Sequence, residues 1–362
     1  MIVNSSLLRK GLLNLFSILI LFTSLTLKGA YIEKVPTIVS NPDGTKIECY
    51  ASGDEFFNYL HDEDGYTIIL GNDGYYYYGV IKSDSLIASE YRVNSVLPKA
   101  TELIPNALIT EQEYKRRVNT YWADVKDDGA KAPHTGTINN LVIYIRFADD
   151  SEFTTKRSIF DGRFNSNTSA SLKDYFKEVS YNQLDITSHH FPIAPLTTNL
   201  SYQDTKDRSY FQPYNATSNP NGYKNSTQSR TREHQLLQRA IEEVEYEIPG
   251  SLEIDADGDG RVDNVCFVIR GNAEGWSDLL WAHRWVLYSY DVRIHGKRVY
   301  DYTFQPENQA VASTISHEMF HTLGAPDLYR YSQDGFNPVG PWDLMSSGYV
   351  HMGAFMKYKY AN

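Results

Sequence analysis

The pattern of apolar and polar positions predicts a chain that mixes strands with helices. Residues 141–147 (LVIYIRF) are almost continuously apolar, which is typical of a strand buried on both faces. Residues 231–244 instead repeat apolar side chains three and four positions apart, which predicts an amphipathic helix. A second buried strand is expected at 265–269 and another helix at about 309–323. Together these elements predict a domain that combines buried strands with helices.

The first third of the chain has a different pattern, with short strands separated by tight turns. Turn signals at 41–44 (NPDG) and 71–74 (GNDG) are flanked by β-forming residues. Residues 52–60 could form one short helix. The pattern therefore predicts a small α+β domain ahead of the larger one.

A polar helix is expected at 110–124, where charged residues are mixed with tyrosine, valine and tryptophan. Residues 127–137 then contain glycines, a proline and charges, which predicts a linker. Exposed segments of this kind are where proteolytic cleavage concentrates, so we expect an activation site there. The predicted boundaries divide the chain into an N-terminal segment (residues 1–30), a small domain (31–109), the helix with its linker (110–137) and a larger domain (138–362).

Composition narrows the class of protein. The chain has 362 residues, enough for two domains, and a hydrophobic content of 41%, which excludes a disordered protein. Its net charge of −11 argues against nucleic acid as the main partner. We expect a monomer.

The N-terminus has the pattern of a signal peptide. Arg9 and Lys10 precede a mostly apolar run from Leu12 to Leu27, and small residues at Gly29 and Ala30 follow it. An uncleaved membrane anchor is the alternative, but polar residues interrupt the run and make it short for a span. No cysteine follows the run, so a lipoprotein is not expected. Export to the cell envelope or the medium, without stable membrane insertion, is the prediction.

The two cysteines, Cys49 and Cys266, fall in different predicted domains. We therefore expect both to be free and packed in the interior. The alternative for Cys49 is a thiol that binds an active-site metal and keeps the chain inactive.

Residues 317–327 (HEMFHTLGAPD) carry the strongest chemical signal. His317 and His321 are one helical turn apart, so they project from the same face and can bind one zinc ion. Glu318 is placed to take a proton from a water that the metal activates. Gly324 suits the left-handed residue that ends a helix, and the chain can then return Asp327 as a third ligand.

Other interpretations of this stretch remain open. The simplest is an ordinary amphipathic helix with two histidines on one face. His283 and His351 are other possible metal ligands, although neither belongs to the motif. A site with three protein ligands and one open position is able to hydrolyse amide bonds.

A second metal site is expected at residues 255–263 (DADGDGRVD). Aspartates at positions 1, 3, 5 and 9 with glycine at position 6 fit an oxygen cage for calcium. Position 12 is Cys266 instead of glutamate and a strand is expected next, so this is not an EF-hand. A solvated acidic turn is the alternative. The candidate calcium ligands are the carboxylates of Asp255, Asp257, Asp259 and Asp263 and the backbone carbonyl of Arg261.

Residues 317–329 (HEMFHTLGAPDLY) resemble the signature of immune inhibitor A-type metallopeptidases, which belong to the metzincin group. Residues 342–346 (WDLMS) resemble the methionine turn beneath the metal of that group, with Met345 as its methionine. Residues 174–181 and 280–285 also resemble its catalytic domain, the latter as the strand at the upper edge of the cleft. In all, the resemblance covers about residues 35–357.

The resemblance implies a metzincin-like α+β catalytic domain, with a mixed sheet and an active-site helix, preceded by a small α+β prodomain. Residues 52–57 (SGDEFF) and 61–67 (HDEDGYT) are similar to the family's propeptide. The implied zinc ligands are His317, His321 and Asp327, with Glu318 as the catalytic base. A tyrosine near the methionine turn could stabilise the oxyanion, and Tyr349 is the nearest one.

The predicted function is a secreted zinc endopeptidase that acts on proteins or peptides and is made as a zymogen. The alternative from another class is a non-catalytic, calcium-binding surface protein that kept the fold. Glu318 argues against that alternative, since a protein without activity needs no general base. A third interpretation is a true peptidase truncated at its C-terminus, because only 17 residues follow Met345.

Overall fold

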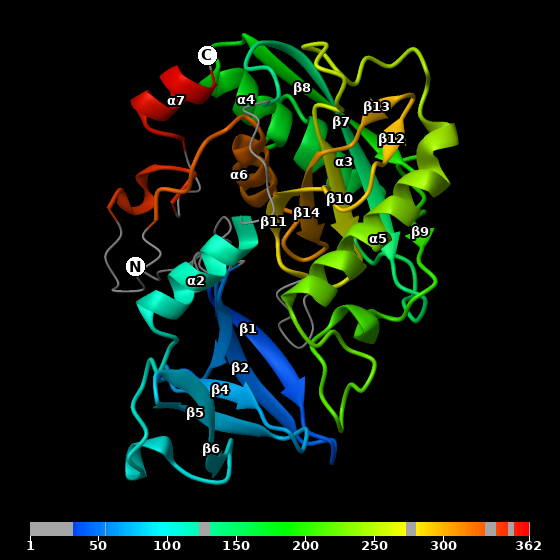
Figure 1. Cartoon of the computed structure of the whole chain (residues 1–362). Coiled ribbons are helices and arrows are strands. Elements are labelled where there is room, and N and C mark those ends of the chain that lie inside the picture. The colour runs from blue at the N-terminus through cyan, green and yellow to red at the C-terminus, as the bar shows by residue number, and fades with distance from the viewer. Residues whose placement is uncertain are drawn as a thin grey trace, which may run out of the picture.

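The computed structural model describes residues 32–54, 56–122, 131–272, 280–329, 338–346 and 351–361. Two parts lie against each other in Figure 1: an N-terminal part (residues 32–122) below and a C-terminal part (residues 131–361) above. The predicted signal peptide lies outside the described residues. Within the described ranges, no helix combines the length and apolar character needed to cross a membrane.

The N-terminal part contains one sheet of six antiparallel strands that pair in chain order. Both predicted turns are confirmed, because Gly44 and Gly74 have φ of +84° and +83°. The amide of each glycine donates to the carbonyl three residues earlier, which closes the turn. The strands are β1 (Ile32–Ser40), β2 (Lys46–Gly53), β3 (Asn58–His61), β4 (Thr67–Leu70), β5 (Tyr76–Lys82) and β6 (Ser85–Arg92).

The helix predicted at 52–60 is wrong, because a tight turn joins β2 to β3 there. Gly53 has a φ of +126°, and a Cβ on it would lie 2.2 Å from the carbonyl oxygen of Phe57. The Asp54 carboxylate accepts the backbone N–H groups of Phe56 and Phe57, both at 2.9 Å. The turn therefore uses the amides that a helix would need, and only glycine fits at its start.

The C-terminal part is built on a mixed sheet in the order β11-β14-β10-β7-β8, with β9 beside β7. All pairs are parallel except β11 with β14, which is antiparallel, so the predicted mixed sheet is confirmed. A separate hairpin, β12 with β13, turns at His295–Gly296. The strands are β7 (Gly136–Arg146), β8 (Leu184–Phe191), β9 (Tyr202–Gln203), β10 (Val265–Ile269), β11 (His283–Val286), β12 (Arg293–Ile294), β13 (Lys297–Arg298) and β14 (Asp301–Pro306).

Helices cover both faces of this sheet (Figure 1). On β7, Leu141 and Ile143 pack with the apolar face of α5, whereas Val142 and Tyr144 pack with α3, α4 and α6. This alternation follows the period of two in a strand and explains the continuous apolar run. The helices are α2 (Glu111–Trp122), α3 (Arg157–Asn165), α4 (Leu172–Val179), α5 (Ser226–Val244), α6 (Ala312–Thr322) and α7 (Ala354–Tyr360), with 3-10 turns η1 (Pro98–Ala100), η2 (Arg208–Phe211), η3 (Glu245–Glu247) and η5 (Gly340–Trp342).

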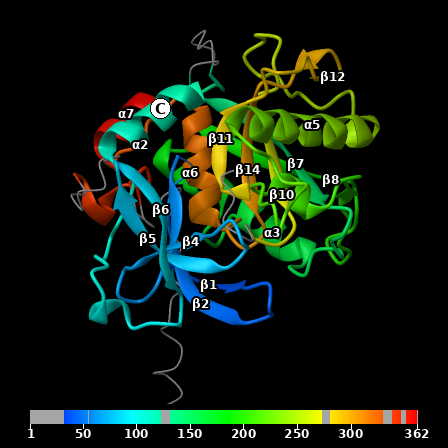
Figure 2. The same cartoon turned by 60° about the horizontal axis from the view of Figure 1, so that its bottom comes forward.

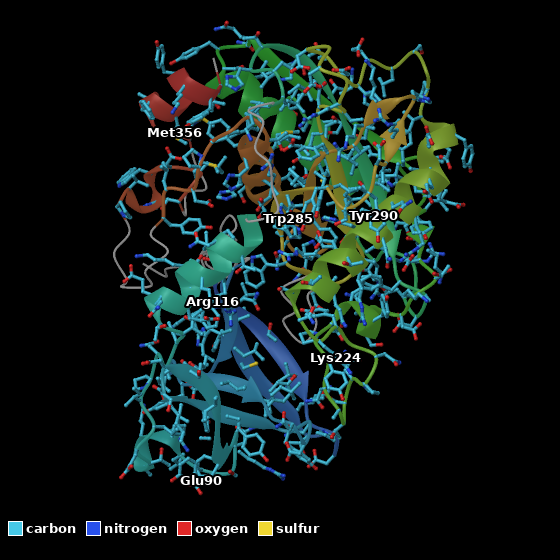
Figure 3. All side chains as sticks on the ribbon, in the orientation of Figure 1. Glu90, Arg116, Lys224, Trp285, Tyr290 and Met356 are labelled. Atoms are coloured by element: carbon cyan, nitrogen blue, oxygen red, sulfur yellow. The ribbon has the colours of Figure 1, made fainter. Side chains whose placement is uncertain are left out.

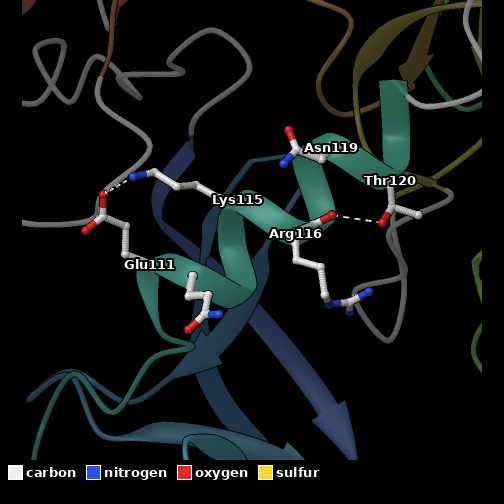
Figure 4. Close-up of a pocket in the computed structure, with 6 residues that line it drawn as sticks. Glu111, Lys115, Arg116, Asn119 and Thr120 are labelled. Carbon is white, nitrogen blue, oxygen red and sulfur yellow. Dashed lines mark hydrogen bonds and ion pairs between the residues drawn. The ribbon is translucent and has the colours of Figure 1, made fainter.

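Helix α2 confirms the helix predicted at 110–124, and in Figure 1 it lies on the side of the N-terminal sheet that faces the C-terminal part. Figure 2 shows the same arrangement from another side, with α2 near α7 in that view. The exposed face of α2 carries an ion pair of 2.7 Å from Glu111 to Lys115, drawn in Figure 4. Tyr114, by contrast, is 1% exposed and packs with Phe56 and Phe57. The N-terminal part thus presents one wall of packed side chains toward the C-terminal part.

Candidate metal centre

The C-terminal end of α6 determines where the chain goes after the two histidines. The Gly324 amide donates to the carbonyl of His321 at 2.9 Å, and the Ala325 amide donates to the carbonyl of Phe320 at 3.1 Å. With φ of +94° at Gly324, this is a Schellman end that reverses the chain after one turn. The predicted left-handed glycine is confirmed, and the reversal brings Asp327 back to the face that carries the histidines.

The structure brings the three predicted ligands together. The Nε2 atoms of His317 and His321 lie 3.2 Å apart, and Asp327 Oδ1 lies 3.1 Å and 3.4 Å from them, respectively. The site is enclosed, because His317 is fully buried and the side chain of Asp327 is only 5% exposed. Three donor atoms therefore converge on one point inside the protein.

These separations match a tetrahedral zinc site. With zinc–nitrogen bonds of about 2.0–2.1 Å, neighbouring ligand atoms of a tetrahedron are about 3.3–3.4 Å apart. The three observed separations of 3.1, 3.2 and 3.4 Å lie close to that value. Two imidazoles and one carboxylate are also a donor set that zinc accepts, with a fourth position left for water or substrate.

The second nitrogen of each histidine fixes its orientation. His317 Nδ1 donates to the Leu344 carbonyl at 3.0 Å, and His321 Nδ1 donates to the Ala325 carbonyl at 2.7 Å. A carbonyl only accepts, so each Nδ1 carries the proton and each Nε2 can present its lone pair to a metal. The sequence motif gives no sign of these two carbonyls.

Charge balance in the protein without metal depends on Asp327. Burial alone would raise the pKa of its carboxyl group, but the two adjacent histidines hold that pKa far below its usual value. In turn, Asp327 raises the pKa of His317 although burial opposes this. A dication bound between them would replace the proton as the partner of the carboxylate.

Glu318 follows His317 on α6 and is buried next to the three donors. It is 1% exposed, and its Oε1 has no hydrogen-bond partner among the described residues. Burial raises the pKa of this carboxyl group, while the charges of His317 and His321 lower it. A buried carboxylate without a partner is costly unless it has a role, and here it can take up a proton from a water at the metal.

The predicted methionine turn lies directly under the site. Met345 is fully buried, its carbonyl accepts the Leu328 amide at 2.6 Å, and Leu344 supports His317. Asp343, which the sequence reasoning did not single out, holds this turn by accepting the Met345 amide at 2.9 Å and the Gly353 amide. The sequence signal for this role of Asp343 was its position two residues before Met345.

The other candidate ligands lie elsewhere. His283 is buried in β11, where its ring bonds to the Trp281 carbonyl and to Glu233, and His351 lies 3.5 Å from Glu178 at the surface. Both cysteines are free and buried as predicted, with Cys49 packed in the core of the N-terminal sheet. Tyr349 lies outside the described residues.

The predicted calcium loop is partly assembled. Carboxylate oxygens of Asp255, Asp257 and Asp259 lie within 4.8 Å of one another, while Asp263 instead accepts the Ala256 amide. Asp255 is buried, and its Oδ1 has no hydrogen-bond partner among the described residues, although Oδ2 accepts from Lys297. Burial and the neighbouring aspartates raise the pKa of Asp263 to about 7.

Comparison with known proteins adds one match. The sequence model of the family described as immune inhibitor A peptidase M6, catalytic domain, matches residues 150–355. That range contains the three converging donors, Glu318 and the methionine turn. A search of curated proteins found no match to the chain.

Proposed function

Because the chain belongs to the immune inhibitor A peptidase M6 family, we propose that it is a secreted zinc-dependent endopeptidase made as an inactive precursor. The observation that carries this proposal is the convergence of His317, His321 and Asp327 at separations of 3.1–3.4 Å. A zinc ion held there would polarise a peptide carbonyl and lower the pKa of a water molecule. Protein or peptide substrates follow from the family.

The chain's own residues would handle the proton and the substrate. Glu318 accepts the proton of the attacking water and delivers it to the leaving amine. Strand β11 is at the edge of the sheet and lies next to α6, so its backbone can pair with an extended peptide. Met345 and Leu344 form the floor that keeps His317 in place.

The test of this function is a measurement on the full chain after cleavage in the linker. Zinc content near one per chain together with hydrolysis of casein would support the proposal. A chain that binds zinc stoichiometrically but cleaves no protein would contradict it. Absence of zinc together with calcium binding would favour the non-catalytic surface protein instead.

We propose that the N-terminal part is the propeptide and covers the site. Arg230 of α5 donates to the carbonyl of Thr120 on α2 at 3.1 Å, and Asn215 donates to the carbonyl of Gly71 at 2.9 Å. Burial raises the pKa of Asp54 to about 7, and the carboxylate of Asp327 adds to the shift, which places Asp54 within electrostatic reach of the metal ligands. The precursor would then be inactive because the N-terminal part covers the site.

Replacing Asp54 by alanine is expected to weaken latency. The substitution leaves the Tyr114 hydroxyl, which donates to Asp54 at 2.6 Å, and two turn amides without their acceptor. A loss of about 1–3 kcal/mol raises the population of the uncovered state about 5- to 150-fold. Hydrolysis by the uncleaved Asp54→Ala chain measures this, with the exposed Asp64→Ala as control. Equal rates in the two variants would contradict the proposed cover.

We also propose a structural calcium ion at residues 255–263, supported by the three close carboxylates and the buried oxygen of Asp255. Calcium at 100 times its dissociation constant should stabilise the chain by about 2.7 kcal/mol. Thermal unfolding with and without calcium measures this, and Asp255→Asn should remove most of the gain. A melting temperature that does not respond to calcium would reject the site.

Export is proposed from the N-terminal pattern alone, as secretion or retention in the cell envelope. The extracellular setting agrees with the two buried thiols, since neither is available for exchange. Mass spectrometry of the exported chain would identify the cleaved N-terminus.

A further inference from the structure

A cavity of about 570 Å³ separates α2 from the C-terminal part and is not used by the chemistry described above. Figure 3 labels Arg116, Lys224 and Trp285, which line it from three different elements. From the N-terminal part it is lined by Phe56, Arg116, Arg117 and Thr120. The remaining lining belongs to the loop before α5, the first turns of α5 and strand β11.

The floor of the cavity carries a buried ion pair. His283 and Trp285 are two positions apart on β11, so both side chains point to the same side of the strand. His283 bonds to the Trp281 carbonyl at 2.8 Å and to Glu233 at 2.9 Å, while the Tyr302 hydroxyl also donates to Glu233. Both ring nitrogens thus face acceptors, which requires an imidazolium paired with a carboxylate.

Two further cations of the C-terminal part line the same cavity. Lys224 is exposed, with its Nζ 4.6 Å from the centre of the Tyr214 ring, and Arg230 lies over the Trp285 ring at 5.9 Å. Among the described residues that line the cavity, the only acidic side chain is Glu233, which His283 already balances. The C-terminal side of the cavity therefore has a net positive charge.

The cavity lies beside the candidate metal centre. Strand β11, which carries His283 and Trp285, packs against α6, the helix that carries His317 and His321. A substrate that extends along β11 from the metal centre would pass its side chains over this cavity.

The N-terminal part places one backbone acceptor there, beside its own cations Arg116 and Arg117. The carbonyl of Thr120 accepts from Arg230 in the last turn of α2, and the carbonyl end of a helix carries about half a negative charge. When the N-terminal part leaves, Arg230 loses this partner and a carboxylate can take its place.

We propose that this cavity is a substrate subsite that selects an acidic side chain next to the cleaved bond, and that α2 covers it in the full chain. The inference rests on the proposed peptidase function. It names glutamate or aspartate in the substrate as the group that the cations at Lys224 and Arg230 recognise.

The test uses the full chain cleaved in its linker and peptides that differ only in glutamate, glutamine or lysine at single positions around the cleaved bond. At one position, glutamate should raise kcat/KM about fivefold or more over glutamine. Lys224→Glu should cancel or reverse this preference, whereas Lys359→Glu on the distant α7 should keep it. Equal rates for glutamate and glutamine at every position would overturn the subsite.

A binding measurement separates the subsite from the chemistry. The same peptides are titrated into the cleaved Glu318→Ala chain and followed by fluorescence anisotropy, which requires no hydrolysis. Tighter binding of the glutamate peptide, lost in the Lys224→Glu, Glu318→Ala double variant, supports the subsite even if the wild type cleaves nothing. If the wild type cleaves no peptide, the proposed peptidase function is rejected and the subsite is retained. Equal binding of all peptides would reject the subsite.

Discussion

Glu318→Ala is expected to lower the rate of peptide hydrolysis by the activated chain by about a thousandfold or more. General acid–base catalysis contributes about a hundredfold to ten-thousandfold, and here one carboxylate both accepts the proton of water and delivers it to the amine. Its Oε1 has no described hydrogen-bond partner, so the group is available for this transfer. Loss of both roles removes stabilisation made only in the transition state.

The measurement compares kcat and zinc content in Glu318→Ala and wild type. Zinc content should not change, because Glu318 is not among the three donor atoms. Stability should not fall, since the variant removes a buried carboxyl group whose pKa burial raises. Glu243→Ala, an exposed acidic position on α5, serves as the matched control. Activity within tenfold of wild type would show that another group is the base.

Asp327→Ala is expected to remove zinc and activity together. The variant leaves two donors where a catalytic zinc site needs three, so affinity should fall by more than the roughly 10–100-fold typical of outer partners. It also leaves the buried imidazoles of His317 and His321 without their carboxylate. Breaking such a buried pair destabilises by about 3–5 kcal/mol in the metal-free chain.

Zinc titration and thermal unfolding of the metal-free protein measure the two effects separately. His351→Ala is the matched control, because His351 is a rival ligand by sequence but lies at the surface near Glu178. It should keep both zinc and stability. The opposite pattern, with zinc lost in His351→Ala and kept in Asp327→Ala, would reject the assigned third ligand.

The α2 helix has consequences for how the chain would become active. It packs Tyr114 against the turn that holds Asp54 and offers its last carbonyls to Arg230. Linker residues after the helix also touch the site, because His134 bonds to the Leu323 carbonyl at the end of α6. Cleavage in the linker would therefore release contacts at both ends of the cleft while leaving the C-terminal sheet intact.

The sequence predicted the elements that short-range spacing controls. Histidines four positions apart on a helix, a glycine at its end and an aspartate three residues later are local relations, and the backbone geometry of α6 preserves them. The continuous apolar run at 141–147 likewise predicted a strand covered on both faces. The helix expected at 52–60 failed because one glycine and one aspartate side chain close a turn that periodicity does not reveal.

Sequence alone therefore determined the donor set of the candidate metal centre and most of the strands and helices, since these depend on neighbours along the chain. Only the tertiary structure decided which carbonyls orient His317 and His321, that Asp343 holds the methionine turn, and that His283 pairs with Glu233. The contacts of His317 with Leu344 and of His283 with Glu233 join residues that are distant in the sequence. No pattern of spacing carries that information, because it depends on how the strands, helices and loops of the C-terminal part pack.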